Sequence, residues 1–163
     1  MGRRLISTLV LVLGALLPVA AMAQQPGDDV PFTSLLMDAS SSMAGARDEV
    51  IVDVERFRKV WDDVHRVNPE PPPLPQVDFS HSMVVVVSMG QQPTSNAAIL
   101  IKRVLLVRGQ ADGYPLLLVQ AVETRPGRKC IVLPSSSGPI HIIELPFYPD
   151  VSFQRIRKTY SCQ

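Results

Sequence analysis

Residues 83–90 read Met-Val-Val-Val-Val-Ser-Met-Gly, and this run constrains the fold more than any other stretch. β-Branched side chains have restricted χ1 rotamers and fit a pleated strand better than a helix. An apolar run without polar alternation, closed by Gly90 and followed by Pro93, is typical of a strand buried on both faces. Residues 77–82 alternate in polarity, with Val77, Phe79 and His81 on one side, and extend the predicted strand toward the N-terminus. The sequence therefore predicts a central strand over residues 77–90.

A single helix is predicted before this strand. Asp53 is a good N-cap residue, and Val54, Phe57, Trp61 and Val64 follow at helical spacing. We expect Trp61 to fill the core beneath a sheet. The prolines of 69–75 fix φ and remove N–H donors, so this segment is predicted to be an extended connector.

Six further segments have strand character, and the fold class that results is β-dominated α+β: an antiparallel or sandwich-like sheet with one packed helix. The first two segments are expected to pair as a hairpin across a turn at 40–45, and the third and fourth through a turn at 109–113 that contains Asp112-Gly113. Residues 135–138 are expected to form a flexible loop. Ile156 is out of register with Val151 and Phe153, which suggests a bulge. The predicted strands are 32–37, 49–52, 98–108, 115–123, 140–145 and one that starts at 151.

The N-terminal 23 residues have the pattern of a signal peptide. Arg3 and Arg4 precede an apolar stretch, and Ala21-Met22-Ala23 matches a cleavage site. The stretch is short for a membrane span, although an uncleaved anchor is the competing interpretation. We expect cleavage before Gln24, a disordered segment over 24–31, a single domain over 32–163, and no membrane insertion after cleavage.

The charge balance changes when the signal peptide is removed. The remaining chain has 14 basic and 15 acidic side chains, so it lacks the basic surplus of a nucleic-acid-binding protein. A periplasmic or secreted location is expected. Cys130 and Cys162 are the only cysteines, and an even number in an exported protein favours a disulfide. Metal ligation is the alternative, but two thiols without a Cys-x-x-Cys motif support it poorly.

Catalytic patterns are weak. The histidines are His65, His81 and His141, and the chain contains neither Gly-x-Ser-x-Gly nor a glycine-rich phosphate loop. The adjacent pair Asp62-Asp63 points in two directions on a helix and makes a poor acid pair. We expect a protein that is not an enzyme and needs no cofactor or metal, with an unrecognised hydrolase as a remaining alternative.

The order Val77-Asp-Phe-Ser80, the valine-rich strand, Met89-Gly90 and Gln91-Gln-Pro-Thr94 resembles the C-terminal domain of the PrcB family, secreted subunits of bacterial protease complexes. The preceding helix, the later paired strands and the late cysteines fit the same family, and the resemblance covers about residues 50–162. The family's turn reads Pro-Thr-Gly-Gly-Tyr, where this chain has Pro93-Thr-Ser-Asn-Ala97. The resemblance implies an exported, non-catalytic module that binds or stabilises a protein partner, such as a secreted protease. The same loop is loosely similar to that of chagasin-type protease inhibitors, which gives the alternative function.

Two loops are the candidate partner-binding sites, because rigid scaffolds commonly present binding residues on loops. The first is 91–97; it holds the position of the family motif, and the alternative is an ordinary turn in which Asn96 adopts positive φ. The second is basic and precedes Cys130; the alternative is a solvated charged loop. The candidate residues are Gln92, Thr94, Asn96, Arg125, Arg128 and Lys129.

Overall fold

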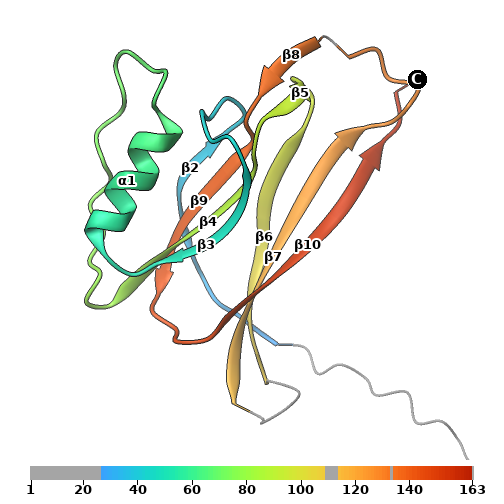
Figure 1. Ribbon diagram of the computed structural model, residues 1–163. Coiled ribbons are helices and arrows are strands. Elements are labelled where there is room, and N and C mark those ends of the chain that lie inside the picture. Colours follow the sequence, from blue (N-terminus) through green and yellow to red (C-terminus); the bar gives the residue numbers. More distant parts are fainter. Residues whose placement is uncertain (1–26, 109–113, 133, 163) are drawn as a thin grey trace, which may run out of the picture.

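The computed structural model of the chain describes residues 27–108, 114–132 and 134–162. The predicted signal peptide, its cleavage site and the predicted turn at 109–113 lie outside the described residues. Figure 1 shows three layers: helix α1 (Val54–Val64), the sheet that it covers, and a second sheet on the far side. The β-dominated α+β class is confirmed, with a sandwich of two sheets and one packed helix.

Each of the two main sheets has four strands. The helix-covered sheet is antiparallel, and the open sheet is antiparallel except for its last pair. A short ribbon of two further strands, β5 (Gln92–Thr94) and β8 (Pro134–Ser137), stands at one end. The helix-covered sheet runs in the order β2 (Thr33–Asp38), β9 (Ile140–Pro146), β4 (Ser82–Met89), β3 (Ala46–Ile51), and the open sheet in the order β1 (Asp28–Asp29), β6 (Ala98–Arg108), β7 (Pro115–Pro126), β10 (Val151–Tyr160).

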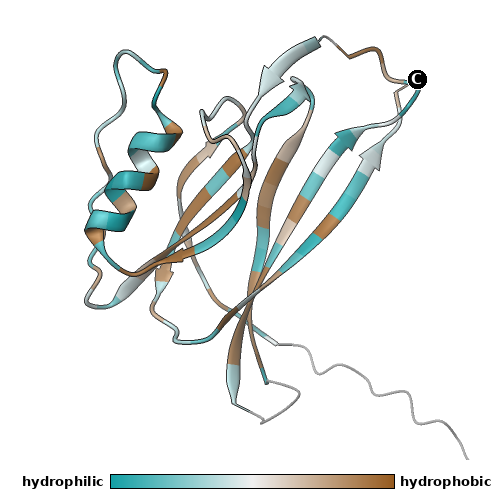
Figure 2. Ribbon diagram, in the orientation of Figure 1, coloured by the Kyte–Doolittle hydropathy of each residue, from teal (hydrophilic) through white to brown (hydrophobic). Residues whose placement is uncertain are grey.

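The valine-rich strand β4 lies inside the helix-covered sheet, with β9 and β3 on its two sides. Its alternate residues Met83, Val85 and Val87 belong to the core between the two sheets, whereas Val84 and Val86 pack toward α1. The prediction of a strand buried on both faces is therefore confirmed. In Figure 2 the hydrophobic residues concentrate on the middle strands of the two main sheets, as burial in the core requires.

The predicted extension of this strand to residue 77 is wrong. Residues 79–81 form a turn, because the Asp78 carbonyl accepts hydrogen bonds from the amides of His81 and Ser82. The turn leaves His81 exposed, while Phe79 packs edge-on against Phe57 of the helix, with ring centroids 6.1 Å apart.

Helix α1 begins as predicted, and Phe57, Trp61 and Val64 are buried as predicted. Val54 is exposed instead, and the buried face includes Val60. The Asp53 carboxylate accepts a hydrogen bond of 2.8 Å from the amide of Arg56, which is the expected N-cap contact. Phe57 and Trp61 are buried against the sheet, and the indole of Trp61 donates a hydrogen bond to the carbonyl of Pro72 in the proline-rich connector. The connector therefore closes over the helix instead of leading away from it.

The predicted pairing of 98–108 with 115–123 is confirmed by β6 and β7. The other predicted hairpin and two segments predicted to be irregular are wrong, because β-strands also pair with partners far away in the sequence. β2 and β3 do not form a hairpin: β2 pairs with β9, and β3 pairs with β4. Residues 135–138 are not a free loop, since β8 pairs with β5. Within the segment 24–31, the described part is ordered: Asp28–Asp29 pairs with β6, and the amide of Val30 donates to the carbonyl of Val104.

The last strand also differs from its prediction. β10 pairs with β7 in parallel and in unbroken register, so it contains no bulge at Ile156. Val151 and Phe153 pack against the core between the sheets. Ile156 has the opposite parity and therefore lies on the outer face of the open sheet.

His141 on β9 connects the two sheets through hydrogen bonds to Ile101 on β6 of the open sheet and to Ser34 on β2 of the helix-covered sheet. Its Nδ1 accepts a hydrogen bond of 2.9 Å from the amide of Ile101, at the point where the register between β6 and β7 shifts. The other ring nitrogen, Nε2, therefore carries the proton and donates to Ser34 Oγ at 3.0 Å. The bond from the Ile101 amide requires an unprotonated Nδ1 and therefore a neutral ring, and burial lowers the pKa of His141.

This histidine predicts a pH dependence of stability. Because the folded-state pKa lies below the unfolded value of about 6.5, acidification protonates the unfolded state first. The free energy of unfolding should therefore fall as the pH decreases below about 6.5, until the lowered folded-state pKa is passed. His141→Leu should flatten this part of the profile and lower the stability at pH 7.5 by about 1–3 kcal/mol, because it leaves the Ile101 amide unpaired. Urea denaturation across this pH range measures both effects; an unchanged slope in the variant would contradict this role of His141.

Candidate functional site at the disulfide-bridged end

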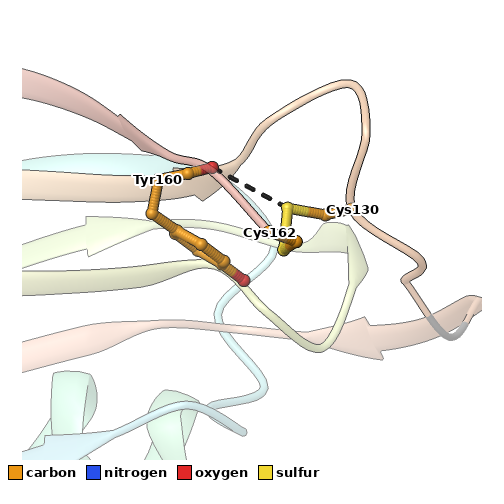
Figure 3. The surroundings of a disulfide bond; sticks show 3 residues. All are labelled: Cys130, Tyr160 and Cys162. Carbon is orange, nitrogen blue, oxygen red and sulfur yellow. Dashed lines mark hydrogen bonds between the residues drawn. A yellow bond between two sulfur atoms is a disulfide. The ribbon is translucent and has the colours of Figure 1, made fainter.

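The parallel pairing of β7 and β10 brings two basic segments together at one end of the open sheet. Arg157 lies opposite Glu123, and Thr159 lies opposite Arg125. Beyond β10, Cys162 forms a disulfide with Cys130, which confirms the predicted bridge. In Figure 3 the bridge lies beside Tyr160, whose carbonyl oxygen is 3.7 Å from Cys130 Sγ and accepts a hydrogen bond from the amide of Gly127. The loop after β7 is thereby fixed to the end of β10.

The disulfide should contribute strongly to stability. It spans 32 residues, and the chain-entropy model gives about 3–4 kcal/mol for a loop of this length. Cys130→Ser combined with Cys162→Ser should lower the midpoint of denaturation accordingly. The bridge ties only the end of β10, so the far-ultraviolet circular dichroism of the folded variant should stay unchanged. A variant as stable as the parent would show that the bridge does not hold this end.

A buried carboxylate lies below the disulfide. The side chain of Glu123 is 3% exposed, and its Oε1 accepts a hydrogen bond of 2.7 Å from Arg155. Arg155 also binds Asp48 on β3 and donates to the carbonyls of Arg47 and Ser88, so it connects β10 to the helix-covered sheet. Burial alone would lower the pKa of Arg155, but its hydrogen bonds to the two carboxylates raise it.

Two more guanidinium groups approach the same carboxylate. Arg125 and Arg157 each place a nitrogen 3.6 Å from Oε2 of Glu123, an atom that has no hydrogen-bond partner. Both side chains are largely exposed, Arg157 to 80%. The two carboxylates of Glu123 and Asp48 therefore do not balance the three arginines around them, and positive charge remains at the surface.

We name this surface the basic end and define it by Arg125, Arg128, Lys129, Arg157 and Lys158. Arg128, Lys129 and Lys158 are exposed and have no ion-pair partner within the described ranges. The chain is strongly polarised: residues 24–123 contain 8 basic and 13 acidic side chains, whereas residues 124–163 contain 6 basic and 2 acidic ones. The upper ends of β7 and β10 are correspondingly hydrophilic in Figure 2.

The other predicted loop lies at the same end of the sandwich, but the Gln92 side chain and the Thr94 backbone make contacts within the loop and its ribbon. Gln92 donates to the carbonyl of Met89 at 2.7 Å, and Ser137 of β8 donates to the carbonyl of Thr94 at 2.6 Å. Asn96 is exposed and does not adopt positive φ; in the described chain only Gly90 does, at +64°. The structure therefore places Gln92 and Thr94 in the framework of the β5–β8 ribbon.

The base of this ribbon is tightly packed. A Cβ atom on Gly138 would lie 2.0 Å from the carbonyl oxygen of Ser41, so only glycine fits there. Gln91 donates to the same carbonyl and accepts from Ser136. These contacts fix the ribbon rigidly beside the basic end.

One Ser–His–Asp cluster exists at the surface turn before β4. Ser80 Oγ lies 2.8 Å and Asp78 Oδ2 lies 3.0 Å from Nδ1 of His81. A catalytic triad needs the serine and the aspartate on opposite ring nitrogens, whereas here both contact the same one. The hydrogen bonds from Ser80 and then His81 lower the pKa of Asp78 to about 2. The cluster is therefore an Asx-type turn with an exposed histidine, not a proton relay.

The remaining grooves and side-chain clusters of the described residues offer few groups for catalysis or metal binding. A shallow apolar groove of about 430 Å³ lies between the end of β2 and the start of β6, and Asp38 is its only ionisable lining residue. Within the described ranges no cluster of three or more potential metal ligands is found. No helix in the same part of the chain is long and apolar enough to cross a membrane.

Sequence reasoning identified three members of the basic end and missed Arg157 and Lys158. These two residues join Arg125 only because β10 pairs with β7 in parallel. The concentration of positive charge after residue 124 was the available signal. No family model matches the chain, and no curated protein or solved structure shows significant similarity to it.

Proposed function

We propose that this chain is an exported, non-catalytic binding module whose contact surface is the basic end. The observation that supports this most is a group of exposed cations on a strand end that a disulfide and a buried ion cluster hold in place. Fixed charges give specificity and fast association without reorganisation of the binding surface. The partner is a protein with an acidic contact surface.

The resemblance to the PrcB family suggests which partners to test first. It implies a secreted protease or another envelope protein that this module binds or stabilises in the periplasm or outside the cell. A disulfide-bonded fold suits such an oxidising compartment. The alternative of a chagasin-like inhibitor depends on the 91–97 loop, in which the Gln92 side chain already binds the loop's own backbone.

Affinity capture with the mature protein tests the proposal. Immobilised protein is incubated with envelope extract from its source cell, and captured proteins are identified by mass spectrometry. Two variants are compared with the parent: Arg125→Ser/Arg128→Ser/Lys129→Ser at the basic end and Gln92→Ala/Thr94→Ala/Asn96→Ala in the ribbon. The basic-end variant should lose the captured partner, and capture by the parent should weaken with salt.

The ribbon variant is the matched control, because it lies at the same end of the molecule and keeps the charge. Loss of capture in the ribbon variant alone would contradict the proposal and favour the inhibitor alternative. Dose-dependent inhibition of a papain-type protease by the parent would be the direct sign of that alternative. Circular dichroism must show that both variants fold.

A further inference from the structure

Among the described residues, no strand pairs with the outer edge of β10. In the described chain β10 is the last strand of the open sheet and pairs only with β7. The carbonyls of Asp150 and Tyr160 accept from Leu117 and Gly127 on the β7 side. Successive residues of a strand direct their backbone groups to opposite edges, so even-numbered residues of β10 bind β7 and odd-numbered residues point outward. Arg157 and Thr159 therefore direct their N–H and C=O groups to an edge at which no strand of the described residues pairs.

Only the C-terminal part of this edge, at Arg157 and Thr159, is exposed to solvent. Val151 and Phe153 pack against the inter-sheet core, and Arg155 reaches across to β3. Arg157 and Thr159, beyond this link, are exposed, and the disulfide keeps their strand end in place. An open stretch of edge thus lies within the basic end.

The side chains along this stretch differ between the two faces. Arg157 points toward the inner side, where Arg125 and the buried Glu123 lie. Ile156 and Tyr160 have the opposite parity and are half-buried on the outer face, on either side of Lys158. A strand added beside β10 would meet cations on one face and mainly apolar groups on the other.

We propose that the upper edge of β10, from Arg157 to Tyr160, binds an extended protein segment that alternates acidic and apolar residues and adds to the open sheet as a fifth strand. The main chain of the segment pairs with the outward groups of Arg157 and Thr159. Its carboxylates face Arg125 and Arg157, and its apolar side chains lie on Ile156 and Tyr160. This inference rests on the proposed function and specifies the chemistry of the partner.

The backbone contribution distinguishes such a segment from a polyanion. A sulfated glycan or an anionic membrane uses the cations but cannot pair with a strand edge. Acidic residues alone would also leave Ile156 and Tyr160 uncovered.

A short synthetic peptide serves as the probe. Acetyl-(Glu-Val)₄-amide carrying a fluorophore is titrated with the mature protein, and binding is measured by fluorescence anisotropy. Hydrogen exchange by NMR should slow at the amides of Arg157 and Thr159 when the peptide is added. The amides of Lys158 and Tyr160, which face β7, should change little. A fully N-methylated peptide with the same side chains should not bind, because it has no donors for the strand edge.

Two substitutions at Thr159 separate the backbone contribution from that of the side chain, and a third substitution, at Arg157, tests the contribution of charge. Thr159→Pro removes an outward N–H without removing a bond to β7, and proline is tolerated at such edge positions. It should weaken peptide binding by about three- to tenfold, as expected for one lost hydrogen bond, whereas Thr159→Ala should leave it unchanged. Arg157→Gln should weaken binding and reduce its salt dependence.

The results of the peptide experiments test strand addition, whereas the capture experiment tests the proposed function, so the two can fail independently. If the N-methylated peptide binds as well as the parent peptide, or if Thr159→Pro has no effect, the strand-addition inference is wrong even when the basic end captures a partner. Binding of heparin or of phosphatidylglycerol vesicles that exceeds peptide binding would also overturn it in favour of a polyanion surface. Absence of peptide binding to the parent overturns the inference, while the proposed function is judged by capture alone.

Discussion

Trp61→Ala is expected to lower the free energy of unfolding by about 3–5 kcal/mol, as large-to-small changes in a core do. The side chain of Trp61 is buried between α1 and the helix-covered sheet, and its ring packs edge-on against Phe57 at 5.9 Å. The substitution also removes the hydrogen bond from the indole to the carbonyl of Pro72, which closes the proline-rich connector over the helix. Such a loss approaches the whole stability of an ordinary domain.

Urea denaturation followed by circular dichroism measures this effect. Val67→Ala is a suitable control, because Val67 follows the same helix and is 79% exposed. The control should change stability by less than about 0.5 kcal/mol. A near-neutral Trp61→Ala would mean that the helix does not cover the sheet.

Arg155→Met is expected to cost about 3–5 kcal/mol, because it leaves the buried carboxylate of Glu123 without its close partner. Arg125 and Arg157, at 3.6 Å, are too far away to replace the lost hydrogen bond. The variant also loses the contacts to Asp48 and to two backbone carbonyls of the helix-covered sheet. The expected result is a destabilised sandwich on the β3–β10 side.

A second substitution tests the reason for this loss. Arg155→Met/Glu123→Leu should recover much of the stability, because apolar residues of similar volume often replace a buried ion pair without cost. Arg103→Ala breaks the exposed pair with Asp29 and should cost at most about 1 kcal/mol. If the double variant were as unstable as Arg155→Met, lost packing rather than the unpaired carboxylate would explain the effect.

Local patterns predicted much of the fold because they reflect local physics. The N-cap at Asp53, the apolar face of α1 and the buried strand β4 depend on residues near one another in sequence. The predicted range 98–108 matches β6, and the range 140–145 lies within β9. The disulfide followed from the even number of cysteines in a chain that the sequence predicts to be exported.

The predictions that the structure contradicts concern long-range strand pairing and local hydrogen bonds made by side chains. Whether β2 pairs with β3 or β9 depends on strands about 100 residues apart, which no local pattern encodes. The parallel pairing of β10 likewise places Arg157 beside Glu123, and no local sequence pattern encodes this pairing. At residues 77–81 the alternating polarity suggested a strand, but Asp78 binds the following backbone and forms a turn.

The candidate site was therefore predicted in part. The basic loop at Arg125, Arg128 and Lys129 was visible in the sequence, since its cations are contiguous around a proline-glycine pair. Its extension by Arg157 and Lys158 required the fold. The role of Gln92 in its own loop also required coordinates, because a glutamine side chain in a turn serves either a partner or the backbone.

The most direct test of the proposed contact surface is capture by two charge-reversed proteins with equal net charge. Arg128→Glu/Lys129→Glu reverses two exposed cations of the basic end, and Arg58→Glu/Lys59→Glu reverses two exposed cations on α1, across the sandwich. The amount of partner captured from envelope extract is measured for each by quantitative mass spectrometry. The first variant should lose capture, and the second should retain the parental level. Equal capture by both variants, or loss only in the helix variant, would contradict binding at the basic end.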